Sequence, residues 1–294
     1  MIIDWNSPTP TILMRHLYNT FRNKLKSGGL CQSVASTVRW FFCSCFPEEW
    51  IPRLIRRRHA LISRKIDQEF SSTVRYGPFR GLKLSPDSSW SLDDRAAMLF
   101  GMYESEVLEE LQDCSKTNRL FIDLGAADGY YAVGVLSSNL FPSSFCFEIS
   151  PDGQKAILEN ARINGVSERI TVKGIAAKDF HKNFTQEQLA SCVILVDIEG
   201  AEFDLFDEDV FQAFAKATII IELHELFVDR GAEKLKRLMH AGSRTHRIKE
   251  IVTGARDLSR FPEVKGFSDY DRWLICSERR RYLQTWLRFD PIEN

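Results

Sequence analysis

The alternation of apolar and polar positions changes along this chain of 294 residues. From Arg119 onward, short apolar runs of strand length alternate with stretches that have helical spacing. Such alternation is typical of a parallel sheet covered by helices on both faces. We expect strands at residues 120–124, 144–149, 170–173, 192–198 and 218–223, followed by two more at 245–252 and 272–276.

The first part of the chain has a different pattern. Apolar residues at helical spacing over 11–70, interrupted by glycine and proline, predict two or three helices. The segment 51–66 is both basic and amphipathic. It suits a solvated face beside the rest of the protein, or contact of residues 11–70 with an anionic membrane or a protein partner. We therefore expect two domains, a basic helical extension over 1–72 and an α/β domain over 73–294.

A hairpin and two helices are expected between the extension and the first strand. Thr73–Tyr76 and Gly81–Leu84 flank Gly77-Pro78, as the two strands of a short hairpin flank their turn. Apolar spacing then predicts helices around 92–100 and 104–112. All of these elements precede the alternating region.

Charge and cysteine content indicate the setting of the protein. Residues 1–70 carry 11 Lys and Arg against 5 Asp and Glu, whereas the net charge of the whole chain is −1. The remainder is therefore acidic, which disfavours nucleic acid as a partner. The 7 cysteines are an odd number, and Cys43 and Cys45 lack the second pair that a zinc site usually has. We see no secretion signal, and the apolar run 34–46 is too short to span a bilayer, so we expect a cytoplasmic protein with reduced cysteines.

The strongest local signal is FIDLGAADGYYAVGVL, residues 121–136, where an apolar strand enters a glycine-containing turn and then a helix. Gly125 and Gly129 allow the backbone to approach a ligand, and the helix offers unpaired N–H groups. Asp123 is an anion at the strand end, which suits a cationic amino group better than a pyrophosphate. On this interpretation a valine at Gly125 removes ligand binding and leaves the chain folded. A tight turn that binds nothing is the alternative.

The next acidic position favours one class of cofactor. A nicotinamide-binding fingerprint, G-x-G-x-x-G, would need glycine where Ala127 and Tyr130 stand. Glu148 ends the second expected strand, 19 residues after Gly129, where a carboxylate can accept both ribose hydroxyl hydrogens. A turn with an acid at that distance is what an adenosine-containing cofactor requires, although a solvated carboxylate at a strand end is the alternative. Residues 174–176 would then line the adenine.

Acidic residues and a histidine gather after the fourth and fifth expected strands. ILVDIEGAEFDLF places Asp197, Glu199 and Glu202 at one strand end, and IIIELHEL places Glu222 and His224 at the next. Ligands of parallel sheets lie at the carboxyl ends of strands, so these groups should meet in one crevice. His224 can serve there as the base for a hydroxyl, because its ordinary pKa of about 6.5 is near neutral pH. The same group can instead hold Mg²⁺ or Mn²⁺, and a purely structural histidine also fits.

These motifs resemble the FkbM-type methyltransferases. D-x-G-x-x-x-G, the acidic end of the second strand, N-x-x-x-N-G and D-I-E-G-A-E occur in that order, and D-I-E-G-A-E is the most specific of them. The likeness extends to YGPFRGLKL, GMYESEV, THRIKEI and the SERRRYLQTW tail, which are similar to a bacterial branch of that family. It covers roughly residues 74–288 and does not reach residues 1–70.

The resemblance implies a Rossmann-like class I methyltransferase sheet of seven strands, the last antiparallel, which uses S-adenosylmethionine. Such enzymes commonly methylate hydroxyl groups, so the implied acceptor is a hydroxylated small molecule, natural product or glycan. The turn after the first strand would contact the methionine end of the cofactor and Asp197 would lie at the reacting centre. The expected catalytic residues are His224, Asp197, Glu199 and Glu222. The expected cofactor-binding residues, besides Asp197, are Tyr103, Glu104, Asp123, Gly125, Ala126, Ala127, Gly129, Glu148, Ile149 and Ile175.

Two alternatives remain beside O-methylation. A nucleic-acid amine methyltransferase would carry an N-P-P-Y-like stretch to grip a flipped base, where this chain has DIEGAEF. A scaffold that keeps the fold without catalysis, with residues 11–70 as an interaction arm, belongs to a different class. The acids at three separate strand ends argue against a non-catalytic scaffold. Whether the enzyme also needs a divalent metal is left open.

Overall fold

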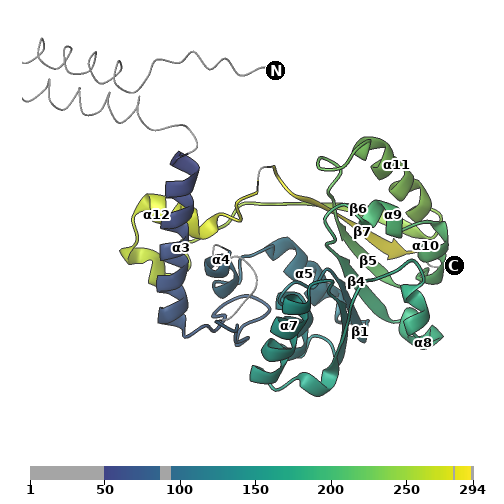
Figure 1. Ribbon diagram of the computed structural model, residues 1–294, viewed down its shortest axis with the longest axis horizontal. Coiled ribbons are helices and arrows are strands. Elements are labelled where there is room, and N and C mark those ends of the chain that lie inside the picture. The colour runs from purple at the N-terminus through teal and green to yellow at the C-terminus, as the bar shows by residue number, and fades with distance from the viewer. Residues whose placement is uncertain (1–49, 87–93, 281, 293–294) are drawn as a thin grey trace, which may run out of the picture. The chain divides into compact units, whose positions relative to one another are not determined.

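The computed structural model describes residues 50–86, 94–280 and 282–292 (Figure 1). The chain divides into two units between Arg57 and Arg58. Apart from the first residues of helix α3 (Trp50–Phe70), every element considered below lies in the second unit. Helices predicted before residue 50 lie outside the described residues, as do Cys43 and Cys45. Among the helices that the structure describes, none is long and apolar enough to cross a membrane.

Helix α3 has the amphipathic pattern predicted for its segment. Ile62, Ile66 and Phe70 lie one helical turn apart and are buried in the core, while Arg64 and Lys65 between them are exposed. The part of α3 that belongs to the second unit therefore packs into the same core as the sheet.

A sheet of seven strands forms the centre of the described second unit, in the order β3-β2-β1-β4-β5-β7-β6. Strands β1 to β5 are parallel, and β7 is antiparallel to both of its neighbours, β5 and β6. The strands are β1 (Leu120–Leu124), β2 (Ser143–Phe147), β3 (Ile170–Lys173), β4 (Cys192–Val196), β5 (Thr218–Glu222), β6 (His246–Val252) and β7 (Thr285–Pro291). This is the Rossmann-like sheet of class I methyltransferases, so the expected fold class is confirmed.

The central strands could be predicted from the sequence because they are fully buried. Every residue of β1, β4 and β5 is buried, because both faces of a parallel sheet are covered and its strands need continuous apolar runs. Strand β3, at the edge, instead alternates between half-buried and exposed positions. The first six strands begin and end within two residues of the predicted limits.

Helices cover both faces of the sheet, with α5 and α7 on one side and α8 to α11 on the other in Figure 1. The first layer packs against strand residues such as Phe121 and Leu195, and the second against Ile122 and Ile194. The helices are α4 (Arg95–Leu99), α5 (Ser105–Cys114), α6 (Tyr130–Ser137), α7 (Pro151–Ile163), α8 (Gln186–Leu189), α9 (Glu202–Leu205), α10 (Glu208–Ala213), α11 (Gly231–Gly242) and α12 (Asp269–Cys276). Short 3₁₀ turns occupy Ser167–Arg169, Phe180–Asn183 and Pro262–Gly266.

The register of the strands brings three acidic residues to one face. Side chains two positions apart on a strand share a face. Asp123 therefore lies on the same side of the sheet as Phe121, and Asp197 follows β4 on the side of Leu195. Glu222, the last residue of β5, pairs with Trp286 of β7, which belongs to the same core as Phe121 and Leu195. The three carboxylates thus meet at the carboxyl edge of the sheet.

Two predicted elements differ from the structure. The prediction of a strand at 272–276 is wrong, because these residues belong to helix α12 and the last strand is β7. In a short apolar run the spacing of residues does not distinguish a helix from a strand. The start of this helix is marked by Ser268, whose hydroxyl accepts the backbone N–H of Asp271 at 3.2 Å. The hairpin expected before residue 85 is reduced to one antiparallel bridge, between Thr73 and Lys83.

Candidate functional site

A cavity of about 410 Å³ lies at the carboxyl ends of β1, β2, β4 and β5, the edge where parallel sheets bind ligands. Cavities of about 300 to 1,000 Å³ typically accept small molecules and cofactors. The expected site residues that line it are Tyr103, Glu104, Asp123, Gly125, Ala126, Ala127, Glu148, Ile149, Ile175, Asp197, Glu199 and Glu222. Gly129 and His224, which were also expected at the site, are not among the described residues that line this cavity.

The turn after β1 brings its backbone against the cavity. Gly125 has a φ of 88°, and a Cβ atom there would lie 1.7 Å from the carbonyl oxygen of Asp197. Only glycine fits both the conformation and the contact. Gly129, with a φ of 85°, is the N-cap residue of α6 and faces Ile157 and Val133. Gly129 therefore shapes the start of the helix and does not itself touch the cavity.

Three non-glycine residues of the cavity wall have left-handed backbone. Their φ values are 44° for Glu104, 50° for Ala127 and 53° for Glu199. Such a conformation is unfavourable for a residue with a side chain and is concentrated at binding and catalytic sites. All three positions belong to the expected site, and the surrounding structure holds each of them in a strained conformation.

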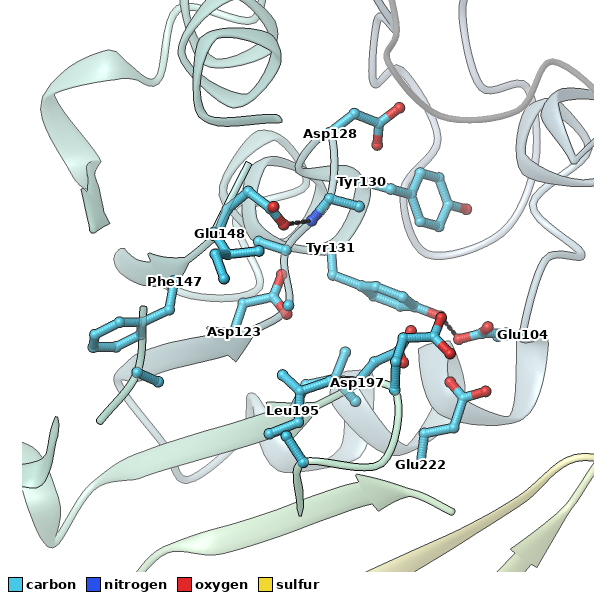
Figure 2. Close-up of a pocket in the computed structure, with 18 of the residues that line it drawn as sticks. Glu104, Asp123, Asp128, Tyr130, Tyr131, Phe147, Glu148, Leu195, Asp197 and Glu222 are labelled. Atoms are coloured by element: carbon cyan, nitrogen blue, oxygen red, sulfur yellow. Dashed lines mark hydrogen bonds between the residues drawn. The ribbon is translucent and has the colours of Figure 1, made fainter. Parts of the chain in front are cut away.

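Asp123 occupies the middle of the site in Figure 2, between Glu148 on one side and Asp197 on the other. The residue is only 2% exposed, and within the described part of the chain its Oδ2 atom has no hydrogen-bond partner. Burial raises the pKa of Asp123 to about 7, and the charge of Glu148 adds to the effect. A buried carboxyl oxygen without a partner is costly, so this position is suited to a ligand that supplies hydrogen-bond donors.

Glu148 follows β2 and holds the turn after β1. Its Oε2 accepts the backbone N–H of Ala127 at 2.8 Å, and its Oε1 accepts that of Ser150 at 2.7 Å. Each carboxylate oxygen has a second lone pair available for a ligand. Beside it, Ile149 and Ile175 also line the cavity and are each 72% exposed, so two aliphatic side chains at the ends of neighbouring strands are available to cover a flat ring.

His224 lies behind the acidic residues of β4 and β5. Its Nε2 atom is 3.6 Å from Asp197 Oδ1, 3.6 Å from Glu199 Oε2 and 3.9 Å from Glu222 Oε1. The structure therefore brings together all four residues expected for catalysis. Burial alone would lower the pKa of His224, but its hydrogen bond to Glu202 and the surrounding carboxylates raise it. Burial among other acids also raises the pKa of Asp197 well above its usual value.

Glu104 extends this charged group toward the segment before α5. Tyr131 donates its hydroxyl to Glu104 Oε2 at 2.5 Å, and Arg280 pairs with Glu104 and also with Glu222, the latter at 2.6 Å. Burial, together with the charge of Glu222, raises the pKa of Glu104 to about 8 despite the guanidinium of Arg280. Arg280 thus joins the loop before α5 to the end of β5.

Three residues of this arrangement were missed by the sequence reasoning as site residues. Tyr131 looks like one apolar position of helix α6, and Arg280 is one of three consecutive arginines in which nothing distinguishes the one that points inward. Glu202 was noted among the acids but given no role, although it is fully buried and contacts His224 Nδ1 at 3.2 Å. Each of the three acts through a contact with a residue far away in the sequence, and no local sequence pattern shows such a contact.

No family model matches the chain, and no curated protein matches it. Similar solved structures include the O-methyltransferase of Bacillus cereus in complex with SAH, 12% identical, over 78% of this chain and 90% of that one, with a TM-score of 0.43. The precorrin-6y C5,15-methyltransferase of Geobacter metallireducens is 12% identical, over 64% and 88%, with a TM-score of 0.43. A tRNA methyltransferase of B. subtilis is 10% identical, over 62% and 65%, with a TM-score of 0.39. All three are methyltransferases, but at this distance the strand order of the chain itself carries the fold assignment.

Proposed function

We propose that this protein is an S-adenosylmethionine-dependent methyltransferase. The observation that carries the proposal is the buried carboxyl of Asp123, which lines the cavity with an oxygen that has no partner among the described residues. The α-amino group of S-adenosylmethionine is a cation with N–H donors, and it supplies what this oxygen lacks. The pyrophosphate of a nicotinamide nucleotide would instead place negative charge against a carboxyl group, which argues against a dehydrogenase.

The rest of the cofactor is accommodated by the neighbouring strand ends. Glu148 would accept the ribose hydroxyls with its free lone pairs, while Ile149 and Ile175 would cover the adenine with the aliphatic surface that they expose. Ala126, Ala127 and the turn around them would lie along the methionine part. Tyr103 and Glu104 line the cavity from the segment before β1 and would close over the bound cofactor.

We place the methyl acceptor near Asp197, Glu199 and Glu222. Figure 2 shows Asp197, Glu222 and Glu104 on one side of Asp123, away from Glu148. Methyl transfer to oxygen forms an O–CH₃ bond as the S–CH₃ bond breaks, and the hydroxyl proton must leave. Carboxylates with His224 behind them provide groups that can receive it. The resemblance of D-I-E-G-A-E to FkbM-type methyltransferases also supports a hydroxyl on a sugar, glycan or natural product.

Calorimetry on the full chain tests the cofactor directly. S-adenosylmethionine should bind with micromolar affinity or better, about −8 kcal/mol or more negative, and NADH titrated in the same way should not bind. The Asp123→Asn variant should bind more weakly while remaining folded. Absence of S-adenosylmethionine binding to the parent chain would contradict the proposal and favour a scaffold that keeps the fold without the reaction.

A screen for S-adenosylhomocysteine release tests the acceptor class. Hydroxylated sugars, glycans and phenolic natural products form one panel, and amines together with tRNA form the other. Turnover confined to the hydroxyl panel is the expected result. Turnover confined to amines or RNA would keep the cofactor assignment and overturn O-methylation.

A further inference from the structure

The imidazole of His224 is surrounded by carboxylates that its Nε2 atom does not hydrogen-bond. The distances to Asp197, Glu199 and Glu222 are 3.6, 3.6 and 3.9 Å, and all exceed the usual N–H···O limit of about 3.2 Å. His224 is nevertheless only 5% exposed. Within the described residues, a ring nitrogen of a buried histidine that lies close to three carboxylates without a hydrogen bond to any of them requires an explanation.

The opposite ring nitrogen is fixed. Nδ1 of His224 lies 3.2 Å from Oε1 of Glu202, which is fully buried. The same carboxylate accepts the backbone N–H of His224 at 3.1 Å and that of Gly200 at 2.8 Å, so it has no freedom to turn away. A carboxylate that accepts from Nδ1–H leaves the lone pair on Nε2, and this is the usual arrangement behind a metal-binding histidine.

Asp197 provides a second polar atom that is suited to a ligand. Its Oδ1 atom is buried and makes no hydrogen bond within the described ranges. One ligand atom each from Asp197, Glu199 and His224 lies within 4.8 Å of the other two. Ligand atoms that share an ion at about 2.1 Å lie about 3 to 4.2 Å apart. The Glu199 side chain is 76% exposed, so little packing hinders it from turning toward the other two ligands.

Glu222, the third carboxylate near His224, already has a cationic partner. Arg280 donates to Glu222 Oε1 at 2.6 Å and pairs with Glu104 as well. In contrast, the ion pairs found within the described residues join Asp197 and Glu199 only to His224. Within the described residues, two carboxylates and one imidazole therefore lie together without a lysine or arginine to neutralise them. Asp197 and Glu199 also line the cavity.

We propose that Asp197, Glu199 and His224 bind a divalent cation, with Mn²⁺ the best match. Carboxylates favour Mg²⁺ and Mn²⁺, whereas an imidazole favours transition metals, and Mn²⁺ satisfies both preferences. Because two of the ligands line the cavity, the open coordination positions face it. If the proposed function holds, a hydroxyl bound there loses its proton more readily.

Binding of Mn²⁺ to the full chain can be measured without cofactor or acceptor. Free Mn²⁺ has a six-line electron paramagnetic resonance spectrum that broadens on binding, and a titration should show a single ion per chain, released by EDTA. Glu199→Gln should weaken the affinity by about tenfold or more, at least the loss seen when an orienting partner of a ligand is removed. Glu208→Gln, which alters an exposed acid outside the group, should bind like the parent.

A spectroscopic signature identifies the histidine. Modulation of the electron spin echo by an imidazole nitrogen should accompany bound Mn²⁺ and vanish in His224→Ala. Absence of stoichiometric binding at millimolar Mn²⁺, or equal affinities in Glu199→Gln and Glu208→Gln, would overturn the site. Glu199 is exposed, so its variant stays informative even if His224→Ala fails to fold. The titration uses no S-adenosylmethionine, so its failure is distinguishable from a failure of the proposed function.

Discussion

The backbone N–H of Ala127 donates to the carboxylate of Glu148 across 2.8 Å. This bond links the turn after β1 to the end of β2, and Ala127 keeps its left-handed φ of 50° at the same point. A charge-assisted hydrogen bond is stronger than a neutral one, which helps to hold the unfavourable backbone. Glu148 therefore holds the turn in place, and if the proposed function is correct it also binds the ribose of the cofactor.

Glu148→Ala should weaken S-adenosylmethionine binding by about 1 to 3 kcal/mol, the loss expected when hydrogen bonds to a charged acceptor are removed. Calorimetry on the full chain measures the effect. Asp152→Ala is the control, because Asp152 is exposed on α7 and within the described part of the chain forms an ion pair only with Lys155. The parent should show a similar loss with a cofactor analogue that lacks the ribose hydroxyls.

The variant and the analogue together separate the two roles of Glu148. If the carboxylate binds the ribose, the analogue should lose little further affinity in Glu148→Ala, because the two changes remove the same contact. Additive losses would show that Glu148 acts only by holding the Ala127 turn. Equal affinity of the parent for both cofactors would remove the ribose contact from the proposal.

Gly125→Ala should destabilise the protein strongly. Sequence reasoning expects a valine here to leave the chain folded, but the added Cβ atom would lie 1.7 Å from the carbonyl oxygen of Asp197, and the φ of 88° adds strain. Overpacking of this kind is typically worth about 1 to 3 kcal/mol or more. The free energy of unfolding from urea titration measures the change.

Gly165→Ala is the matched control for Gly125. It also has a positive φ, of 68°, but a Cβ atom there meets nothing within 4 Å. Its loss should therefore reflect backbone strain alone, about 1 kcal/mol. Similar destabilisation of both variants would mean that the chain around Asp197 yields easily and that the close contact of β1 and β4 is not essential.

The strand ends of the site could be located from the sequence because each follows a continuous apolar run. Asp123, Glu148 and Asp197 stand directly after or at the end of such runs, and the parallel arrangement brings their ends to one edge. The last strand could not be located in the same way. The seventh strand was expected where the structure has α12. Neither α12 nor β7 is fully buried, and Arg288 and Asp290 interrupt the apolar pattern of β7.

The charged walls of the cavity were harder to predict, because they depend on contacts between distant segments. Arg280 meets Glu104 across 176 positions of the chain and Glu222 across 58. Nothing local in three consecutive arginines indicates which one lies inside. The position of His224 beside Asp197 was predictable, since both follow neighbouring strands, but its burial behind the cavity wall was not.

Arg280→Met should destabilise the protein by about 3 to 5 kcal/mol, the usual loss when a buried ion pair is left with uncompensated charge. Glu104 and Glu222, only 4% and 5% exposed in their side chains, would then face each other without a cation. Urea unfolding measures the change, and Arg272→Met is the control because its pair with Asp269 lies at the surface. The loss should be largest above pH 8 and should shrink as the pH falls through the raised pKa of Glu104, about 8, since protonation of that carboxyl removes the repulsion. An equal effect of the two variants would contradict the role given to Arg280.

The pH dependence of stability tests the environment of Asp123. Burial raises its pKa from 3.8 to about 7 in the folded chain. Between these values the folded state keeps a proton that the unfolded state has released, so the contribution of Asp123 to stability falls as the pH rises. The slope is about 1.4 kcal/mol per pH unit. This dependence stops above pH 7, where Asp123 is ionised in both states.

The Asp123→Asn variant tests this pH dependence. Asn is neutral at every pH, so the stability of Asp123→Asn relative to the parent should increase from pH 5 to 7 and then level off. Asp229→Asn, which changes an exposed residue, should show no such trend. A difference between Asp123→Asn and the parent that is constant with pH would show that Asp123 is already ionised in the folded protein and is paired in a way that the structure does not contain.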